Sequence, residues 1–214
     1  MSNLQGIKIL LLGPPRRNEL ICRKFDEYNV EYLNVEKIPV ISEISKYTHL
    51  ITSGFHLRVP NEILKKFPKN KRLNLHATFL PFGKGIGTAL FALIYPVTIG
   101  SSIHILEEKF DSGEIILQEE MEITSNELSQ RELYELWIKH TNFLFLNNFK
   151  SILLGEFKPF PHNKKFKSIY LSRDDSEIFL SLLPESWDTK INVIKEISFL
   201  VSLRHAYNLT EKYL

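Results

Sequence analysis

Cysteine is almost absent from this sequence. The 214 residues include one cysteine, Cys22, so the chain cannot form an intramolecular disulfide, which favours a reducing compartment. Long apolar runs are also missing, because the longest, Ala89–Ile99, is interrupted by Pro96 and falls short of the ~20 residues of a membrane-spanning helix. The apolar stretch Ile9–Leu12 is too short for a signal peptide. We therefore expect a soluble cytoplasmic protein with no membrane partner.

Neither sign of charge is in excess. Lysine and arginine number 27 and aspartate and glutamate 25, which leaves a net charge of +2. Dedicated nucleic-acid-binding proteins usually carry a pronounced basic excess. Five of the eight residues from Lys65 to Arg72 are basic, which we interpret as a charged connection before a strand. The charge balance thus predicts no nucleic-acid partner.

The first half of the sequence alternates short apolar runs with helical patterns. Hydrophobic residues make up 43% and charged residues 24%, which excludes a disordered or fibrous chain. Strands alternating with helices predict an α/β sheet with crossover helices. The expected strands are 6–13, 30–33, 48–52 and 71–75, and the expected helices are 19–28 and 60–67.

The second half contains the longest helical pattern. Residues 125–154 carry apolar residues at helical spacing, including Trp137 and Phe143, which predicts a buried stripe. Trp187, in the C-terminal part, either stacks on a base or packs in the core. The other expected elements are a helix at 88–95, strands at 98–106 and 114–118, and a helical segment at 188–214. We expect a main domain at 1–157 and a small C-terminal subdomain, mostly helical at its end, at 158–214.

Polar side chains suited to catalysis occur at two places. Asn74 and His76 are two residues apart at the end of an expected strand, so they point to one face, at the edge where open α/β sheets bind ligands. Asp111 follows in a charged loop, where its carboxylate could orient the imidazole or raise its basicity. On spacing alone an Asn-x-His pair is more often structural than catalytic. His104, in the intervening strand, is interpreted as a packed or hydrogen-bonded residue.

Three separated segments together resemble the folate-dependent formyltransferases. Residues 74–81 (Asn-Leu-His-Ala-Thr-Phe-Leu-Pro) are similar to the family segment N-x-H-x-S/T-x-L-P, and residues 111–116 (Asp-Ser-Gly-Glu-Ile-Ile) to its D-x-G-x-I segment. Residues 53–59 (Ser-Gly-Phe-His-Leu-Arg-Val) are similar to the segment that lines the folate pocket. The resemblance implies an α/β fold with a Rossmann-like formyltransferase sheet, followed by a small C-terminal extension.

The resemblance also implies transfer of a formyl group from 10-formyltetrahydrofolate to a primary amine, without a metal ion. By motif, Asn74 would donate a hydrogen bond to the developing oxyanion, worth about 3 kcal/mol. His76 would stabilise the same charge or act as a general base, and Asp111 would hold His76 and help to relay the proton. The implied folate-binding residues are Phe55, Leu57, Arg58, Val59, Glu107 and Phe110, and the implied substrate-binding residues are Pro81 and Lys84.

Three groups within this family differ in their amine substrate. Glycinamide ribonucleotide enzymes bind phosphate at a Gly-Ser-rich turn after the first strand, but here Pro14 and Pro15 remove amide donors from that turn. Methionyl-tRNA formyltransferases carry a C-terminal β-barrel that holds RNA, whereas the 55 residues after Pro159 end in a helical pattern. A modest extension favours the third group, which formylates nucleotide-linked amino sugars for bacterial surface polysaccharides such as the O-antigen of lipopolysaccharide.

Alternatives to the amino-sugar prediction stay open. The chain could formylate glycinamide ribonucleotide or methionyl-tRNA, or it could be a non-catalytic protein that kept the fold. A homodimer is a further possibility, because an apolar stripe on a C-terminal helix would suit an interface between two copies. Arg16, Arg17 and Lys84 are candidates, by charge alone, for contact with the diphosphate of a nucleotide-linked substrate.

Overall fold

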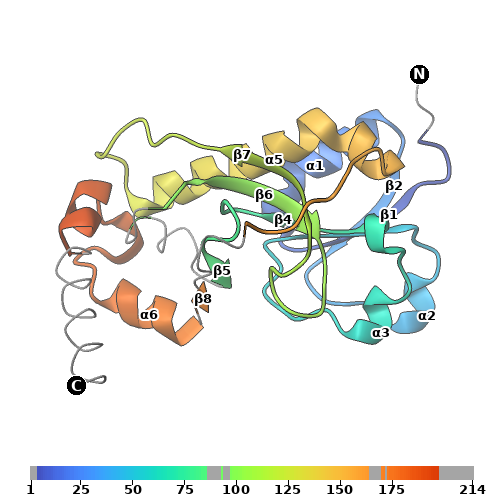
Figure 1. The fold of residues 1–214 in the computed structure, drawn as a ribbon, viewed down its shortest axis with the longest axis horizontal. Coiled ribbons are helices and arrows are strands. Elements are labelled where there is room, and N and C mark those ends of the chain that lie inside the picture. Colours follow the sequence, from blue (N-terminus) through green and yellow to red (C-terminus); the bar gives the residue numbers. More distant parts are fainter. Residues whose placement is uncertain (1–3, 86–92, 94–96, 164–169, 172, 198–214) are drawn as a thin grey trace.

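A six-stranded sheet in the order β2-β1-β3-β4-β6-β7 forms the centre of the computed structural model (Figure 1). The structure describes residues 4–85, 93, 97–163, 170–171 and 173–197. The first four strands of the chain are mutually parallel, while β6 and β7 are an antiparallel pair at one edge, with β6 antiparallel to β4. The strands are β1 (Lys8–Leu12), β2 (Glu31–Val35), β3 (His49–Ser53), β4 (Arg72–His76), β6 (Gly100–Ile105) and β7 (Ile115–Glu120). The predicted α/β sheet is confirmed.

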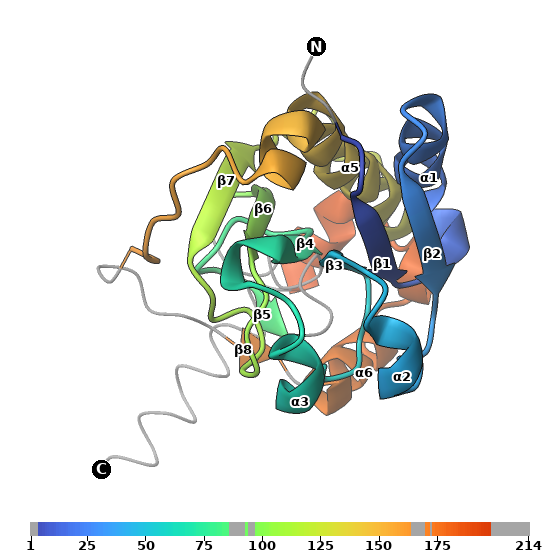
Figure 2. The ribbon, with the colours of Figure 1, turned by 90° about the vertical axis from the view of Figure 1, so that its right-hand side faces the viewer.

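Helices cover both faces of the sheet, as Figure 2 shows. On one face, α1 (Pro15–Glu27) and α5 (Gln130–Leu154) pack on alternate strand residues such as Ile9 and Leu11. On the other face, the short helices α2 (Ile41–Ile44) and α3 (Asn61–Leu64) pack on the intervening residues, such as Leu10 and Leu12. Because side chains alternate along a strand, a continuous run of leucines in β1 supplies both cores.

The long helix α5 begins five residues later than the pattern at 125–154 predicts. Ser129 caps it, because its hydroxyl accepts from the Glu132 amide while the Glu132 carboxylate accepts from the Ser129 amide. The helix ends where Gly155 adopts a left-handed conformation. Trp137 is fully buried as predicted, but the expectation for Phe143 is wrong, because its side chain is 53% exposed. Phe143 lies seven residues after exposed Leu136, on the solvent side of the helix.

The C-terminal part packs against the beginning of α5. Here α6 (Arg173–Ser181), the 3₁₀ turn η2 (Ser186–Asp188) and a helical stretch at 191–197 form a second apolar cluster with the α5 residues Leu133 and Trp137. The short strands β5 (Lys84–Gly85) and β8 (Tyr170–Leu171) pair with each other. The helix expected at 88–95 lies outside the described residues apart from Leu93, and the one expected at 188–214 is described only as far as 197. Among the described helices, none is long and apolar enough to cross a membrane.

Candidate active site

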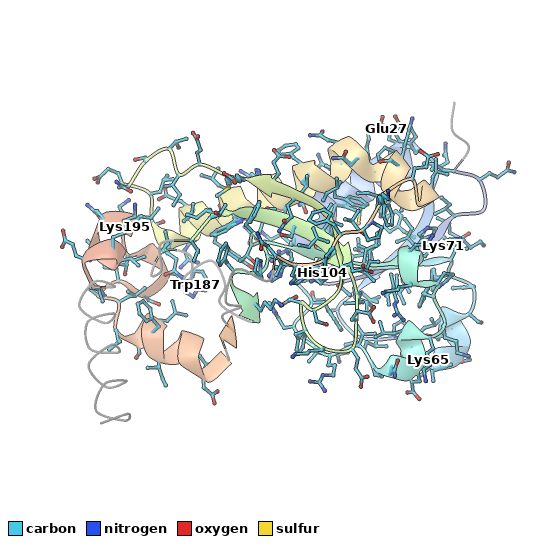
Figure 3. All side chains as sticks on the ribbon, in the orientation of Figure 1. Glu27, Lys65, Lys71, His104, Trp187 and Lys195 are labelled. Atoms are coloured by element: carbon cyan, nitrogen blue, oxygen red, sulfur yellow. The ribbon has the colours of Figure 1, made fainter. Side chains whose placement is uncertain are left out.

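Strand β4 presents two polar side chains on the face opposite α5. Leu73 and Leu75 belong to the core beneath α1 and α5, so Asn74 and His76 point to the other face, as their spacing predicts. The antiparallel register between β4 and β6 places His104 directly opposite Asn74. His104 lies near the middle of the molecule in Figure 3. The sheet thus brings an amide and two imidazoles together at one place.

The loop between β6 and β7 carries Asp111 into this group. Asp111 has a left-handed backbone (φ 49°), and Gly113 lies so close to β6 that an added Cβ would sit 1.8 Å from the Ile105 carbonyl oxygen. This tight approach turns the Asp111 carboxylate inward, where its Oδ2 accepts a hydrogen bond from the Gly85 amide at 2.9 Å. Its Oδ1 lies 3.6 Å from His76 Nδ1 and 3.5 Å from His104 Nε2. All three sequence-predicted catalytic residues therefore meet.

The Asn74 amide is held in one orientation. The Thr52 hydroxyl donates to Asn74 Oδ1 at 2.7 Å, which directs the amide nitrogen toward the cluster. Nδ2 then donates to His104 Nε2 at 2.9 Å and to Asp111 Oδ1 at 3.3 Å. The contact with Asp111 is the longer and weaker of the two, so it is the one that a bound acceptor can replace most readily.

His76 is buried and keeps one ring nitrogen without a hydrogen-bond-length partner among the contacts described. Its Nε2 donates to the Gly83 carbonyl oxygen at 3.1 Å, which leaves the lone pair of neutral imidazole on Nδ1, facing Asp111 at 3.6 Å. Burial lowers the pKa of His76, and although the charge of Asp111 acts in the opposite direction, the pKa stays below that of a free imidazole. His76 is therefore neutral at pH 7 and can take up a proton beside a carboxylate.

Asp111 is ionised under the same conditions. Burial alone would raise its pKa, but the charge that His76 and His104 carry when they take up a proton, together with the Gly85 amide that donates to the carboxylate, outweighs this effect and holds the pKa well below that of an ordinary aspartate. The cluster thus combines an oriented N–H donor, a neutral proton acceptor and a fixed negative charge. This set can stabilise charge on a reacting oxygen and accept a proton from a nucleophile in one small volume.

The implied folate-binding residues lie in the loops that follow β3 and β6. Leu57 is 56% exposed, and the Arg58 guanidinium lies 5.9 Å from the centre of the Phe110 ring, which joins the loops after β3 and β6. Phe55 is half-buried against the core under α2 and α3, and Val59 is buried within that core. The Glu107 carboxylate accepts from Arg72 Nη2 at 2.9 Å, which engages its side chain in an ion pair.

The two implied substrate-binding residues follow β4. Pro81 is buried, whereas Lys84 is half-buried on β5, next to the glycine whose amide binds Asp111. Burial lowers the pKa of Lys84, and the charge of Asp111 opposes this shift. The structure therefore places Lys84 near the cluster, while Pro81 shapes the turn that leads to it.

Two residues of the cluster have roles that the sequence pattern does not predict. His104 is a hydrogen-bonded strand residue, as expected, but it accepts from the Asn74 amide of the neighbouring strand β4, so it belongs to the site. Thr52 orients the same amide from the neighbouring strand β3. The spacing Ser-x-His before Asp-x-Gly is the signal that could have identified His104, whereas Thr52 has no motif of its own and requires the register between β3 and β4.

Known proteins are similar to the part of the chain that carries this cluster. The sequence profile of the family described as "Formyl transferase" matches residues 17–143. A similar solved structure is the formyltransferase PseJ from Anoxybacillus kamchatkensis, in complex with UDP-4,6-dideoxy-4-formamido-L-AltNAc and tetrahydrofolate. It is 26% identical with a TM-score of 0.79, over 87% of this chain and 97% of that one. A Helicobacter canadensis N-formyltransferase, in complex with folinic acid and dTDP-3-aminofucose, shares the fold at 22% identity and a TM-score of 0.64, over 79% of this chain and 72% of that one.

Curated relatives are matched over a smaller share of their own length. A methionyl-tRNA formyltransferase of Clostridium perfringens is 28% identical over 54% of this chain, and one of Levilactobacillus brevis is 25% identical over 89% of it. The chain spans only 37% and 61% of the length of these two proteins.

Proposed function

Because the chain belongs to the formyl transferase family, we propose that it transfers a formyl group from 10-formyltetrahydrofolate to the primary amine of a nucleotide-linked amino sugar. The observation that carries the proposal is the cluster of Asn74, His76 and Asp111, in which the Asp111 carboxylate lies 3.3 Å from the Asn74 amide nitrogen and 3.6 Å from His76 Nδ1. Formyl transfer needs these three groups, because negative charge develops on the formyl oxygen while the attacking amine loses a proton.

Each residue of the cluster has a separate task in this reaction. Asn74 Nδ2 donates to the formyl oxygen in place of its long contact with Asp111. His76 accepts the amine proton at Nδ1, since Nε2 is occupied by the Gly83 carbonyl. Asp111 stabilises the imidazolium that forms and keeps the ring in position, while the Gly85 amide holds the carboxylate. As the new amide bond forms, the bond between the formyl carbon and the folate nitrogen breaks, and the proton taken up by His76 passes to that nitrogen, so that tetrahydrofolate leaves.

The loops beside the cluster fit a reduced folate. They offer an aromatic ring, Phe110, with a guanidinium, Arg58, above it, and the exposed aliphatic side chain of Leu57. An aromatic, carboxylate-bearing molecule is complementary to such a surface. In this proposal the Arg58 guanidinium attracts the carboxylates of the formyl donor, and the Phe110 ring packs against its aromatic rings. The backbone at Glu107 forms hydrogen bonds with its polar groups.

Two observations favour an amino sugar over the other amines. The similarity to PseJ extends over 97% of a protein whose complex holds a UDP-linked formamido sugar. In addition, Pro14 is the N-cap of α1 and Pro15 its first residue, so the turn after β1 has few amides for the phosphate of glycinamide ribonucleotide. The setting that we propose is the cytoplasmic synthesis of a bacterial surface polysaccharide such as O-antigen, with the protein acting as a monomer or a homodimer.

The test is an absorbance assay of 10-formyltetrahydrofolate turnover with a panel of amines. UDP-linked and dTDP-linked 4-amino and 3-amino sugars are compared with glycinamide ribonucleotide and methionyl-tRNA. We expect turnover with one class of amino sugar and none with the other two amines. Turnover with glycinamide ribonucleotide or methionyl-tRNA alone would overturn the proposed substrate. Failure of a reduced folate to raise the melting temperature at saturating concentration would overturn formyl transfer itself.

A further inference from the structure

After helix α5 ends, the chain returns along the edge strand β7. Phe160 forms an antiparallel bridge with Ile115, the first residue of β7, because the Ile115 amide donates to the Phe160 carbonyl at 2.8 Å and the Phe160 amide to the Ile115 carbonyl at 2.9 Å. Figure 2 shows this segment, residues 156–163, in orange beside β7. In antiparallel pairing, two residues forward on one chain face two residues back on the other, so His162 comes opposite Gly113. A histidine outside every sequence motif therefore reaches the loop that carries Asp111.

The His162 side chain holds the Gly113 carbonyl group. His162 Nε2 lies 2.7 Å from the Gly113 carbonyl oxygen, and because a carbonyl can only accept, Nε2 carries the proton and donates. Burial is the largest influence on the pKa of His162 and lowers it, so the ring is neutral at pH 7. The charge of Lys84 lowers the same pKa and that of Asp111 raises it. The imidazole therefore lies close to two residues of the candidate active site.

Gly113 is held from two sides. On one side its backbone packs against β6, where the Ile105 amide donates to the Glu114 carbonyl at 2.9 Å and no Cβ would fit at position 113. On the other side the carbonyl of Gly113 accepts from His162. Two residues earlier, Asp111 has its left-handed backbone (φ 49°), a conformation that persists only where the surrounding contacts maintain it. The bond from His162 is therefore one of the contacts that can set where the Asp111 carboxylate lies.

We propose that His162 is a positioning residue for Asp111, which fixes the turn at Gly113 so that the carboxylate stays beside His76. Asp111 Oδ1 lies 3.6 Å from His76 Nδ1, and a displacement of about 1 Å is enough to impair catalysis by a group of this kind. The inference rests on the proposed function, because it assigns a role to the pair of residues that performs formyl transfer. It also gives the chain beyond α5 a part in the chemistry of the main sheet.

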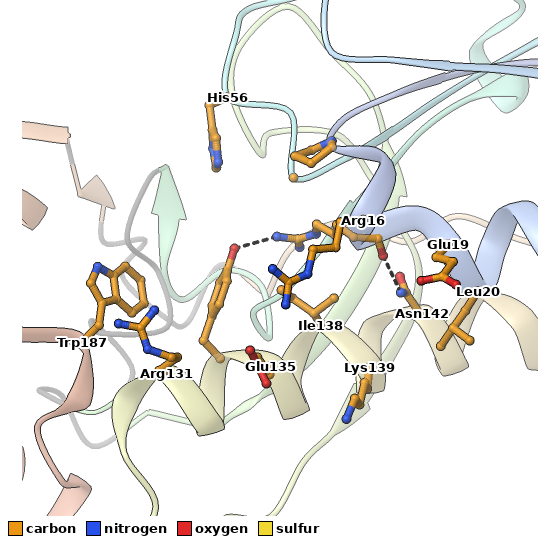
Figure 4. A pocket seen from close by; sticks show the side chains of 14 residues that line it. Arg16, Glu19, Leu20, His56, Arg131, Glu135, Ile138, Lys139, Asn142 and Trp187 are labelled. Atoms are coloured by element: carbon orange, nitrogen blue, oxygen red, sulfur yellow. Dashed lines mark hydrogen bonds between the residues drawn. The ribbon is translucent and has the colours of Figure 1, made fainter.

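His162 lies away from the cavity between α1 and the beginning of α5. Figure 4 shows that cavity, whose lining includes Arg16 and Trp187. Among the described residues that line it, none belongs to the segment 156–163. A substitution at position 162 consequently leaves the lining of the cavity unchanged, and its effect on turnover is expected to arise at the Asp111 loop.

The test compares His162→Gln with His162→Met. The two new side chains have similar length and neither can titrate, but only glutamine has an N–H that can donate to the Gly113 carbonyl. The charge of Asp111 raises the pKa of His76, so a carboxylate that moves away lets this pKa fall. NMR titration of the histidine ring signals is therefore expected to give a lower pKa for His76 in His162→Met than in His162→Gln. This measurement needs neither substrate nor turnover.

Steady-state kinetics gives the second measurement. We expect kcat to fall by about 10- to 100-fold in His162→Met and to recover for the most part in His162→Gln. Added to Asp111→Ala, His162→Met is expected to lower turnover no further, because a residue that acts only through Asp111 has no effect in its absence. Lys158→Gln, which alters an exposed side chain of the same segment, serves as the control and is expected to leave kcat unchanged. Melting temperatures establish that each variant is folded, and His162→Leu, which also lacks a donor, repeats the comparison if His162→Met does not fold.

These measurements separate the role of His162 from the formyl transfer on which it rests. Equal pKa values of His76 in His162→Met and His162→Gln overturn the proposal, as does a further loss of turnover when His162→Met is added to Asp111→Ala. If the pKa values differ as expected but the unmodified protein formylates no amine, His162 positions Asp111 and the proposed function is wrong. If an amino sugar is formylated equally well by both variants, the role of His162 is wrong while formyl transfer stands.

Discussion

His104 Nε2 accepts a hydrogen bond from Asn74 Nδ2 at 2.9 Å, across the antiparallel pair of β4 and β6. His104 Nδ1 lies 2.8 Å from the Ile105 carbonyl oxygen, so Nδ1 carries the proton and Nε2 is the acceptor. With Thr52 bound to the amide oxygen, the Asn74 side chain is held at both ends. The remaining N–H of Asn74 consequently points toward Asp111, where the formyl oxygen is expected.

His104 is therefore expected to act as a positioning residue for Asn74. His104→Ala frees the amide, and we expect kcat to fall on the order of 100-fold with little change in KM, because misplacing a catalytic group by ~1 Å has effects of this size. His104→Gln, whose side-chain oxygen can accept the same hydrogen bond, is expected to recover most of kcat. Steady-state kinetics on the folded variants checks this, and an unchanged kcat in His104→Ala would contradict it.

His76 and Asp111 are expected to be the residues on which turnover depends most. His76→Ala removes the proton acceptor and Asp111→Ala the charge that stabilises it, so each is expected to lower turnover by at least ~100-fold. Asp111→Asn keeps the left-handed backbone that asparagine tolerates and isolates the effect of charge. Ser112→Ala, which alters an exposed neighbour whose hydroxyl donates to the Lys109 carbonyl, serves as the control. Near-normal turnover in either catalytic variant would remove the assignment.

The pKa of His76 tests directly how burial and the charge of Asp111 act on this imidazole. Burial lowers its pKa, so the imidazole is expected to titrate below its ordinary value of about 6.5 and to be neutral at pH 7. The charge of Asp111 opposes that shift, so Asp111→Asn is expected to lower the pKa further. NMR titration of the histidine ring signals, with His76 identified from a His76→Gln variant, measures both. A pKa above 6.5, or one that rises in Asp111→Asn, would show that this account is wrong.

Local patterns predict the parts of the fold that depend on neighbours in sequence. The leucine run of β1 and the apolar spacing of α5 identify these elements, and the spacing of Asn74 and His76 places both on one face. The sequence also contains a signal for the start of α5, because Ser129 and Glu132 have the spacing of a capping box. The error at Phe143 has a physical reason: helical spacing says which residues share a face, but not which face is covered.

The rest of the site depends on pairings between distant segments. His104 meets Asn74, 30 residues away in sequence, only because β6 runs antiparallel to β4 in one particular register. Likewise, the rings of Tyr134 and Trp187 meet, and Arg131 forms an ion pair with Asp188, only because the C-terminal part packs on the beginning of α5. Register and docking of this kind leave no periodic signal in a single sequence. The sequence therefore locates the catalytic motifs, and the structure adds the groups that orient them.

Stability at acid pH is expected to depend on His49, which is remote from the catalytic cluster. Its side chain is 1% exposed and its Nε2 lies 3.0 Å from the Leu153 carbonyl oxygen at the end of α5. Burial lowers the pKa of His49 to about 4, against about 6.5 in the unfolded chain. Above pH 6.5 the imidazole is neutral in both states and contributes no pH dependence. Between pH 6.5 and 4 the unfolded chain binds a proton that the folded protein does not, so stability falls as the pH falls.

The expected size of this effect follows from proton linkage. One proton of difference gives a slope of about 1.4 kcal/mol per pH unit, on the order of 3 kcal/mol between pH 6.5 and 4. Urea unfolding from pH 8 to pH 4.5 measures it, in the unmodified protein and in His49→Gln, whose amide can still donate to Leu153. We expect the slope below pH 6.5 to be smaller in the variant, while the two curves run parallel between pH 7 and 8. Equal slopes below pH 6.5 would mean that His49 is protonated in the folded protein, and that the contact between β3 and the end of α5 opens at acid pH to admit the charge.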